Sequence, residues 1–412
     1  MSSTQILIGP FKQAITLSGL KSKGPIKDEE MLIVENAGIT VENGNISQVG
    51  VFEKLAKSTS QVHEIKGPQI CLPGLIDTHT HICFGGSRAR DYAARNNGKT
   101  YLEIAKEGGG IWDTVGKTRA ATEEELIKST IKRANRHLNE GVTTIEVKSG
   151  YGLSIDEELK MLRAIQKASV STSSNLISTC LAAHILPRDF DGDHQAYLEY
   201  ISTELFPILQ QERLTNRIDA FIEEEAFSSK IATAYFLKAK ELGFDITVHA
   251  DQFSTGGSEV AVNVGAVSAD HLEASGNREI ELLAKSDTIA TALPGASMGL
   301  GVAFTPGRKI LDAGGSLAIA SDWNPGSAPM GDLLMQAAVL GSYEKLSNAE
   351  VLSGLTFRAA AALRLTDRGR LEAGMKADLA IFETEHYNEI FYHQGKLKPS
   401  MVFKEGTQVI KK

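Results

Sequence analysis

The sequence predicts an α/β protein built from a TIM-like (β/α)8 barrel and a small β-sandwich domain that both chain termini share. Three observations lead to this prediction. Short apolar runs alternate with helical patterns through the middle of the chain, alternating strands occur near both ends, and 412 residues suffice for one barrel and a smaller domain. We therefore expect the barrel over residues 72–365 and the β-sandwich domain over residues 1–71 and 366–412.

Composition and charge narrow the class of protein. Hydrophobic residues make up 42% of the chain and charged residues 23%, which is ordinary for a globular protein. The net charge of −8, without any Lys/Arg cluster, argues against a nucleic-acid partner. We see no signal peptide and no membrane span. Cys71, Cys83 and Cys180 lie in apolar runs, which indicates reduced thiols and a cytoplasmic protein.

The two ends of the chain predict β structure. Near the N-terminus, short alternating strands are expected at residues 31–34, 38–41 and 46–49. Asn43-Gly44 predicts a hairpin turn there, because both residues tolerate positive φ. A second β region opens at residue 369, with strands expected at 401–403 and 408–410. The simplest arrangement pairs both regions into one domain without catalytic residues of its own.

From residue 72 the pattern changes to strand, loop and helix, repeated. The first strand begins at residue 72 and runs into the polar residues 77–81. The other expected strands cover residues 141–147, 176–183, 217–222, 245–248, 267–269, 288–293 and 316–320. Helices are expected from about Ser154, which can cap its helix, and at residues 330–340 and 348–363. Strands that alternate with helices in this way form a parallel barrel.

Reactive side chains stand where these strands end. They are Asp77, His79 and His81, Glu146 and Lys148, His184, Glu223, Glu224 and Glu225, His249 and Asp251, Asp270 and His271, and Asp322. The carboxyl ends of parallel barrel strands meet at one mouth, so we expect these side chains to lie together. Gly108-Gly109-Gly110 is expected to form a mobile loop over that mouth.

His79 and His81 indicate a metal site. Two residues apart on one strand, their rings leave the same face, with Cα atoms about 6.6 Å apart. Neutral imidazole is a good ligand for transition metals. A lone His-x-His pair is more often a surface pair or a buried structural pair, so the metal prediction depends on the other strand ends.

Four features spread over nearly the whole chain resemble the metal-dependent amidohydrolase superfamily. They are Pro-Gly-Leu-Ile-Asp-Thr-His-Thr-His at residues 73–81, the distant His249, Ser321-Asp322, and Gly-x-Leu-x-x-Gly-x-x-Ala-Asp-Leu at residues 369–379. Narrower motifs at residues 84–88, 146–152, 268–271 and 322–327 resemble the imidazolonepropionase family. That family opens the ring of 4-imidazolone-5-propanoate to N-formimidoyl-L-glutamate, the third step of L-histidine degradation.

The resemblance implies roles for individual residues. Implied metal ligands are His79, His81, His249 and Asp322, holding one Zn2+ or Fe3+ per subunit. Implied contacts to the small-molecule substrate are Arg88, Tyr101, Tyr151, His184, Asn324, Gly326 and Ser327. Two-metal members of the superfamily use a modified lysine on the fourth strand, which is absent here, so one ion is expected. A homodimer is expected from the resemblance alone.

The implied chemistry is attack of a metal-bound hydroxide on the ring carbonyl, with Asp322 or His271 taking the water proton and returning it to the departing nitrogen. Gln252 stands where some members of the family place a glutamate proposed to handle protons. An amide cannot transfer a proton at neutral pH, so the glutamate version of the mechanism does not carry over to this chain. Arg88 offers a planar fork for the propanoate, although a single loop arginine often forms only a surface ion pair.

Two other functions fit parts of the pattern. A one-metal deaminase of a purine or pyrimidine ring would share the ligands, but Arg88 with residues 324–327 favours a substrate that carries a carboxylate. A non-catalytic scaffold relative would be expected to have lost metal ligands, and all four are present. Ammonia release would support the deaminase, and a protein without metal would support the scaffold.

Overall fold

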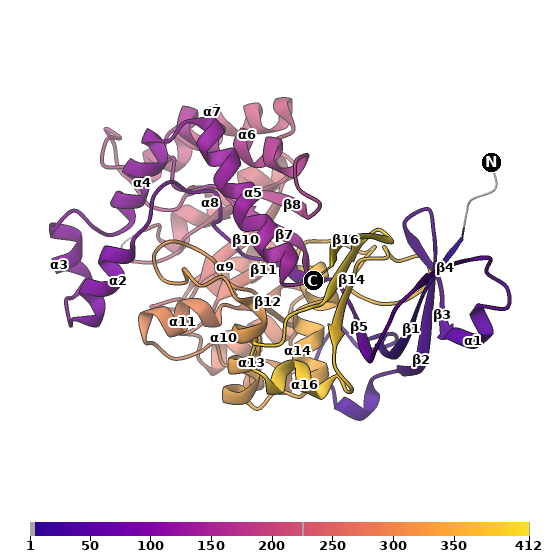
Figure 1. The fold of residues 1–412 in the computed structure, drawn as a ribbon. Helices are drawn as coiled ribbons and strands as arrows, with labels where there is room; N and C mark the ends of the chain where they lie inside the picture. Colours follow the sequence, from indigo (N-terminus) through magenta and orange to yellow (C-terminus); the bar gives the residue numbers. More distant parts are fainter. Residues whose placement is uncertain (1–4, 225, 412) are drawn as a thin grey trace.

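The chain folds into a parallel barrel and a separate β-rich unit (Figure 1). The computed structural model describes residues 5–224 and 226–411, without the side chains of residues 101, 102 and 105. Tyr101 therefore falls outside the described side chains, and Glu225 outside the described residues. In Figure 1 the indigo N-terminal strands and the yellow C-terminal strands lie side by side, and the barrel occupies the middle of the colour range.

The barrel sheet has eight strands that are hydrogen-bonded in the order of the sequence. They are β6 (Leu75–Asp77), β7 (Val142–Lys148), β8 (Asn175–Ala183), β9 (Arg217–Ala220), β10 (Asp245–Ala250), β11 (Ser268–His271), β12 (Ile289–Ala292) and β13 (Leu317–Ile319). A parallel bridge between Thr80 and Trp323 brings the first and last strands together just beyond their ends. The predicted barrel is thereby confirmed.

Helices surround the barrel strands and cover the loops above them. They are α2 (Ala89–Asn96), α3 (Tyr101–Lys106), α4 (Ile111–Ala120), α5 (Glu123–Asn139), α6 (Ile155–Ser169), α7 (His194–Glu212), α8 (Ser229–Glu241), α9 (Gly257–Val264), α10 (Asn277–Lys285), α11 (Pro294–Leu300), α12 (Gly307–Asp312), α13 (Leu333–Glu344), α14 (Asn348–Gly354) and α15 (Phe357–Ala362). Helix α5 shows how the sequence specifies them. Thr122 and Glu125 form a reciprocal capping box at its start, and Leu126, Thr130 and Ala134 recur every four residues on its buried face. Among residues 5–224 and 226–411, no helix has the length and apolar character needed to cross a bilayer.

The second unit is a mixed sheet of eight strands from both ends of the chain. Its strands are β1 (Ile6–Ile15), β2 (Ile33–Glu42), β3 (Asn45–Val51), β4 (Gln61–Glu64), β5 (Gln69–Pro73), β14 (Leu379–Glu383), β15 (Met401–Lys404) and β16 (Thr407–Lys411), with α1 (Phe52–Leu55), η1 (Asp28–Glu30) and α16 (Asn388–Tyr392) beside them. The two ends of the chain meet in the antiparallel pair of β5 and β14, where Leu72 faces Ala380. The joint β unit is confirmed, whereas the division of the chain at residues 71 and 366 stays a prediction.

The first barrel strand differs from the prediction. The run from residue 72 is divided between two sheets, because β5 ends at Pro73 and β6 begins at Leu75. A Cβ at Gly74 would lie 2.4 Å from Thr143 Oγ1, so only glycine lets the chain pass between the two sheets at this point. The strand also ends before His79. Beyond the strand, Thr80 lies between the two histidines and forms a parallel bridge with Trp323, which holds this segment against the chain that follows the last barrel strand.

Other elements also differ. The two strands expected at residues 31–34 and 38–41 are one continuous strand, β2, and β4 was not expected. Strand β1 has no counterpart among the expected strands, because Gly9 and Pro10 interrupt its alternation and produce a register shift against β2. The single helix expected over residues 348–363 is two helices, α14 and α15, which are divided where Thr356 takes a non-helical conformation.

Candidate active site

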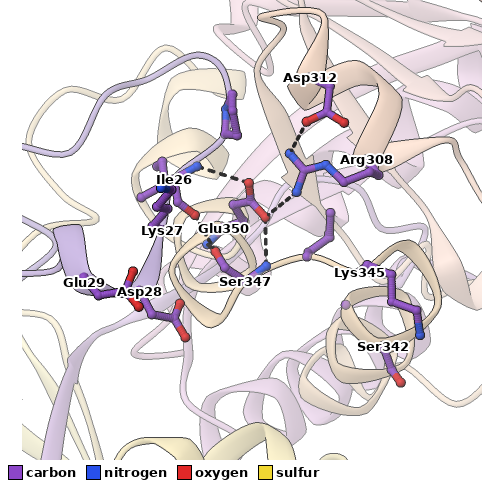
Figure 2. A pocket seen from close by; sticks show the side chains of 13 residues that line it. Ile26, Lys27, Asp28, Glu29, Arg308, Asp312, Ser342, Lys345, Ser347 and Glu350 are labelled. Carbon is purple, nitrogen blue, oxygen red and sulfur yellow. Dashed lines mark hydrogen bonds and ion pairs between the residues drawn. The ribbon is translucent and has the colours of Figure 1, made fainter.

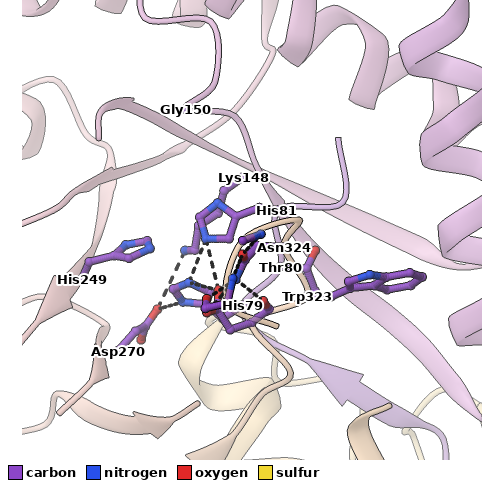
Figure 3. A network of polar contacts seen from close by, with 12 residues as sticks. His79, Thr80, His81, Lys148, Gly150, His249, Asp270, Trp323 and Asn324 are labelled. Atoms are coloured by element: carbon purple, nitrogen blue, oxygen red, sulfur yellow. Dashed lines mark hydrogen bonds and ion pairs between the residues drawn. The ribbon is translucent and has the colours of Figure 1, made fainter. Parts of the chain in front are cut away.

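Three of the predicted metal ligands, His79, His81 and His249, are neighbours at the carboxyl end of the barrel (Figure 3). The fourth, Asp322, forms a buried group with His79 and His81. The Nε2 atoms of His79 and His81 are 3.2 Å apart. Asp322 Oδ1 lies 3.5 Å from the first of these nitrogens and 3.4 Å from the second. The ring of His249 is 4.5 Å from that of His79, centroid to centroid. His271 belongs to the same buried cluster, since its ligand atom lies within 4.8 Å of those of His79 and His249.

Outer carboxylates fix the orientation of two of the imidazoles. His79 Nδ1 is 2.7 Å from Asp270 Oδ2, and His249 Nδ1 is 2.9 Å from Asp219 Oδ2. Because a carboxylate only accepts, these contacts assign the proton to Nδ1 in both rings and leave Nε2 with a lone pair. The Nε2 lone pairs of His79 and His249 and the carboxylate of Asp322 are all buried. Acceptors gathered in this way need a cation, and three imidazoles with one carboxylate are a donor set that a transition metal accepts.

Lys148 neutralises the carboxylates behind the cluster. Its Nζ lies 2.7 Å from Glu146 Oε1, 2.9 Å from Asp219 Oδ2 and 3.8 Å from Asp270 Oδ2, and all these side chains are buried. Burial alone would lower the pKa of the ammonium, yet the three carboxylates raise it above its ordinary value. Burial, and next the charge of Lys148, holds the pKa of His79 well below its ordinary value, so this ring stays neutral as a ligand must be.

The turn over residues 324–327 is built around Asn324. Its Oδ1 accepts the N–H groups of Gly326 at 2.7 Å and Ser327 at 2.8 Å. Its Nδ2 donates to Asp322 Oδ2 at 2.9 Å and to the Ser327 hydroxyl at 2.8 Å. These bonds occupy one oxygen of Asp322 and leave Oδ1 directed at the histidines. The sequence motif after the eighth strand thus orients the carboxylate that precedes it.

Tyr151 and His184 lie beside His81. The rings of His184 and His81 stack at 5.6 Å, and Tyr151 lies 5.8 Å from His81. His184 Nδ1 donates to the Gly150 carbonyl at 2.9 Å, so its Nε2 keeps a lone pair. Burial lowers the pKa of His184 to about 3, which makes this ring a neutral group at physiological pH.

A protein-family model described as the amidohydrolase family matches residues 90–410 of this chain. The imidazolonepropionase of Bdellovibrio bacteriovorus is 37% identical over 98% of this chain and 96% of its own. The imidazolonepropionase of Clostridium tetani is also 37% identical, over 100% of both chains. The chain belongs to the imidazolonepropionase family of amidohydrolases. The resemblance found in the sequence motifs is confirmed.

Solved structures resemble this imidazolonepropionase-family chain in fold. A triazine hydrolase variant superposes with a TM-score of 0.76 at 18% identity, covering 99% of this chain and 95% of its own. An adenosine deaminase from Xanthomonas campestris with bound zinc gives a TM-score of 0.72 at 16% identity, covering 99% and 93%. At such low identity the likeness shows the fold.

His271 and Gln252, the other predicted catalytic residues, differ in how the structure places them. His271 belongs to the cluster and faces Glu273 at 3.4 Å; burial would lower the pKa of His271, yet the Glu273 carboxylate raises it above the ordinary value. Gln252 is half-buried in the loop after β10, and within the described part of the chain no hydrogen bond joins its amide to the cluster. Asp251, His271 and Asp322 have positive φ values of 51°, 86° and 48°. Non-glycine residues in this strained conformation concentrate at functional sites.

Sequence reasoning assigned no role to the groups that support the imidazolonepropionase-family site. Asp270 and Asp219 hold two of the histidines, and Lys148 pairs with these carboxylates. Glu158 on α6 holds the loop that carries Tyr151. The Glu158 carboxylate accepts the N–H groups of Gly150, Gly152 and Leu153 at 3.1, 2.8 and 2.8 Å. The even spacing of Glu146 and Lys148 on one strand was a usable signal for a shared inward face. A helix glutamate gives no such signal.

A shallow pocket away from the cluster lies between residues 25–29 and helices α12 to α14 (Figure 2). Buried Glu350 lies at its centre and accepts the N–H groups of Ile26 and Ser347 and a bond from Arg308. None of the predicted site residues lines this pocket. Since its buried carboxylate is fully paired within the chain, its polar groups serve the packing of the N-terminal loop on the barrel.

Arg88 and Gly326 contact each other closely. A Cβ built on Gly326 would lie 2.5 Å from Arg88 Nη1. We expect Gly326→Ala to displace the guanidinium and to raise KM about 10-fold, with kcat changed less than about 3-fold because the metal cluster is untouched. Steady-state kinetics on the substrate proposed below measures both constants. Gly116→Ala is the matched control, because a Cβ there meets no atom within 4 Å. An identical KM for the two variants would contradict a role for Arg88 in binding.

Proposed function

We propose that this chain hydrolyses 4-imidazolone-5-propanoate to N-formimidoyl-L-glutamate, the third step of L-histidine degradation. The observation that carries the proposal is a pair of buried groups that share His79, one with His81 and Asp322 and the other with His249 and His271. Arg88 lies close to the turn that follows Asp322, and the chain aligns over its full length with imidazolonepropionases. The cluster suits hydrolysis of a carbonyl compound, and the guanidinium suits its propanoate tail.

His79, His81, His249 and Asp322 are the residues that would hold one Zn2+ or Fe3+ in this proposal. Such an ion, when bound, lowers the pKa of water and polarises a carbonyl group. The outer carboxylates Asp270 and Asp219 serve it by fixing the tautomers of two ligands. Nitrogen and carboxylate ligands suit either metal.

The chain's own residues would handle the proton. The Asp322 carboxylate accepts the proton that the attacking water gives up, while Asn324 keeps its other oxygen engaged. His271, held by Glu273, can pass a proton to the ring nitrogen as the C–N bond breaks. Asp322 then returns its proton to His271, so that in sum one proton of the water ends on the nitrogen that leaves the carbonyl carbon. The carbonyl carbon becomes a carboxylic acid, which releases its remaining proton to solvent and leaves a carboxylate.

The remaining contacts would orient the substrate. The two Nη groups of Arg88 bind both propanoate oxygens. Tyr151 and His184 lie next to His81, where the aromatic face of the tyrosine and the neutral imidazole of the histidine can contact the flat ring of the substrate. Asn324 and the small Gly326 leave room for the tail. Tyr101 keeps its proposed role as a substrate contact, and Gln252 its proposed place in the mouth, as a group that hydrogen-bonds without transferring protons.

The direct test supplies the substrate freshly, made in place from urocanate by urocanase. We expect N-formimidoyl-L-glutamate to form, to stop forming after treatment with a chelator, and to form again when Zn2+ or Fe3+ is added back. Metal content is measured on each sample. A metal-loaded protein that gives no product would contradict the proposed reaction.

The alternative of a purine or pyrimidine deaminase has no support among the 37% identical relatives, which are imidazolonepropionases. Ammonia release from guanine or cytosine would revive it. We also propose a cytoplasmic homodimer. The three cysteines are buried and unpaired, which suits a reducing compartment, and the dimer rests on family resemblance.

A further inference from the structure

Arg88 is held in place by one carboxylate. It precedes helix α2, and its Nε donates to Asp91 Oδ2 at 2.9 Å. The side chains are 13% and 7% exposed, so the pair is largely withdrawn from water. Among the described residues, Asp91 is the single hydrogen-bond partner of the Arg88 guanidinium. Both Nη groups therefore stay available for a ligand.

Asp91 also holds the glycine turn that the sequence predicts to be a mobile loop. The same oxygen, Oδ2, accepts the Gly110 N–H at 2.8 Å. A Cβ on Gly109 would lie 2.5 Å from Asp91 Oδ1, so the turn packs against the carboxylate so closely that only glycine fits. Asp91 thus joins the start of α2 to the turn before α4.

A second arginine fixes the far end of α2. Arg95 Nη2 donates to the Gly326 carbonyl at 3.0 Å. Gly326 is the residue against which Arg88 Nη1 lies, and the Asn324 amide orders the same turn. Helix α2 is therefore attached at both ends, by Asp91 to residues 109–110 and by Arg95 to residues 324–327. Arg88 stands immediately before the helix, with its Nε already bonded to Asp91.

We propose that Asp91 is a positioning residue that aims the Arg88 guanidinium at the carboxylate tail of the ligand, and so makes this site select anionic tails. The inference rests on the proposed function of Arg88. A free arginine loses rotamer freedom when it binds, whereas one fixed at Nε presents its two Nη groups in a set plane. Two parallel N–H···O bonds to a carboxylate need that plane.

The alternative is a purely structural role, in which Asp91 only supports the turn at residues 109–110. The two roles differ in what a variant does to ligands with and without a tail. A merely structural residue would affect both kinds of ligand alike, because the metal cluster and the ring contacts would move with the loop. A residue that aims Arg88 would affect only the ligand that carries the carboxylate.

The experiment uses two stable probes on the metal-loaded full chain, 3-(imidazol-4-yl)propanoate and 4-methylimidazole, which lacks the tail. Binding is measured by calorimetry for wild type, Asp91→Ala and Asp91→Asn. We expect Asp91→Ala to weaken the propanoate probe about 10-fold and to leave 4-methylimidazole within about 2-fold. With the true substrate, KM should rise about 10-fold while kcat stays within about 3-fold.

Asp113→Asn is the matched control, since Asp113 is a nearby carboxylate that pairs with Lys117 on α4. It should bind both probes as wild type does. If Asp91→Ala does not fold, Asp91→Asn decides, because its side-chain carbonyl still accepts the Gly110 N–H but loses the charge that holds Arg88. Equal weakening of both probes, or no weakening of either, overturns the inference.

The outcomes also separate this inference from the proposed function. A wild-type protein that prefers the tailed probe but does not turn over 4-imidazolone-5-propanoate contradicts the proposed reaction alone. A wild-type protein without that preference overturns the Arg88 clamp and this inference together.

Discussion

Asp322→Asn is expected to lower kcat by a factor of about 10²–10⁴. Asparagine matches aspartate in size, so the turn over residues 324–327 can persist, but an amide cannot accept the proton of the attacking water. Its oxygen is also a weaker partner for a cation than the carboxylate that now faces His79 and His81 at 3.5 and 3.4 Å. The measurement is kcat with freshly generated substrate, with the metal content determined on the same sample so that loss of metal and loss of the base are separated.

Asp312→Asn serves as the control for this variant. Asp312 is 61% exposed and pairs with Arg308 on the surface of the barrel, and it belongs to neither group of the metal cluster. It should keep the wild-type kcat. If Asp322→Asn retained full metal and a kcat within about 3-fold of wild type, proton transfer by this carboxylate would be ruled out.

Lys148→Met is expected to lower the free energy of unfolding by about 3–5 kcal/mol. Methionine fills a similar volume, but Glu146, Asp219 and Asp270 would lose the ammonium that they surround. Removing one partner of a buried charged group leaves uncompensated charge in a low-dielectric interior, which is far more costly than losing a surface pair. Urea unfolding of the metal-loaded protein, followed by circular dichroism, measures the change.

Lys128→Met gives the comparison for stability. Lys128 pairs with Glu124 on the surface of α5, with side chains 72% and 75% exposed, and its loss should change the free energy of unfolding by less than about 0.5 kcal/mol. Equal stabilities for the two methionine variants would show that the charges around Lys148 are compensated by other groups.

The sequence predicted the barrel well because its evidence is local. Each strand is a short apolar run, and the reactive residues stand directly at the strand ends, so the order of strands implies a shared mouth. His79, His81, His249 and Asp322 could be chosen from such positions. The break at Gly74 could not be predicted, since it depends on Thr143 occupying the space beside it.

The supporting groups were harder to predict for a different reason. Whether Asp219 and Asp270 face the histidines depends on the register between neighbouring barrel strands, which the sequence does not state. Asp91 and Gly110 are nineteen residues apart and meet only because the intervening helices fold back. Strand β1 was missed because Gly9 and Pro10 disrupt the alternation by which strands are found.

The pairing of β5 with β14 determines when the mixed sheet can be completed during synthesis of the chain. Strand β5 leads through Gly74 directly into β6 and the first two histidines, yet its antiparallel partner begins only at Leu379. A chain emerging from the ribosome therefore carries this strand edge without its β14 partner until residues 379–383 have been translated. Other edge-binding chains, or chaperones that cover such edges, have access to it throughout that interval.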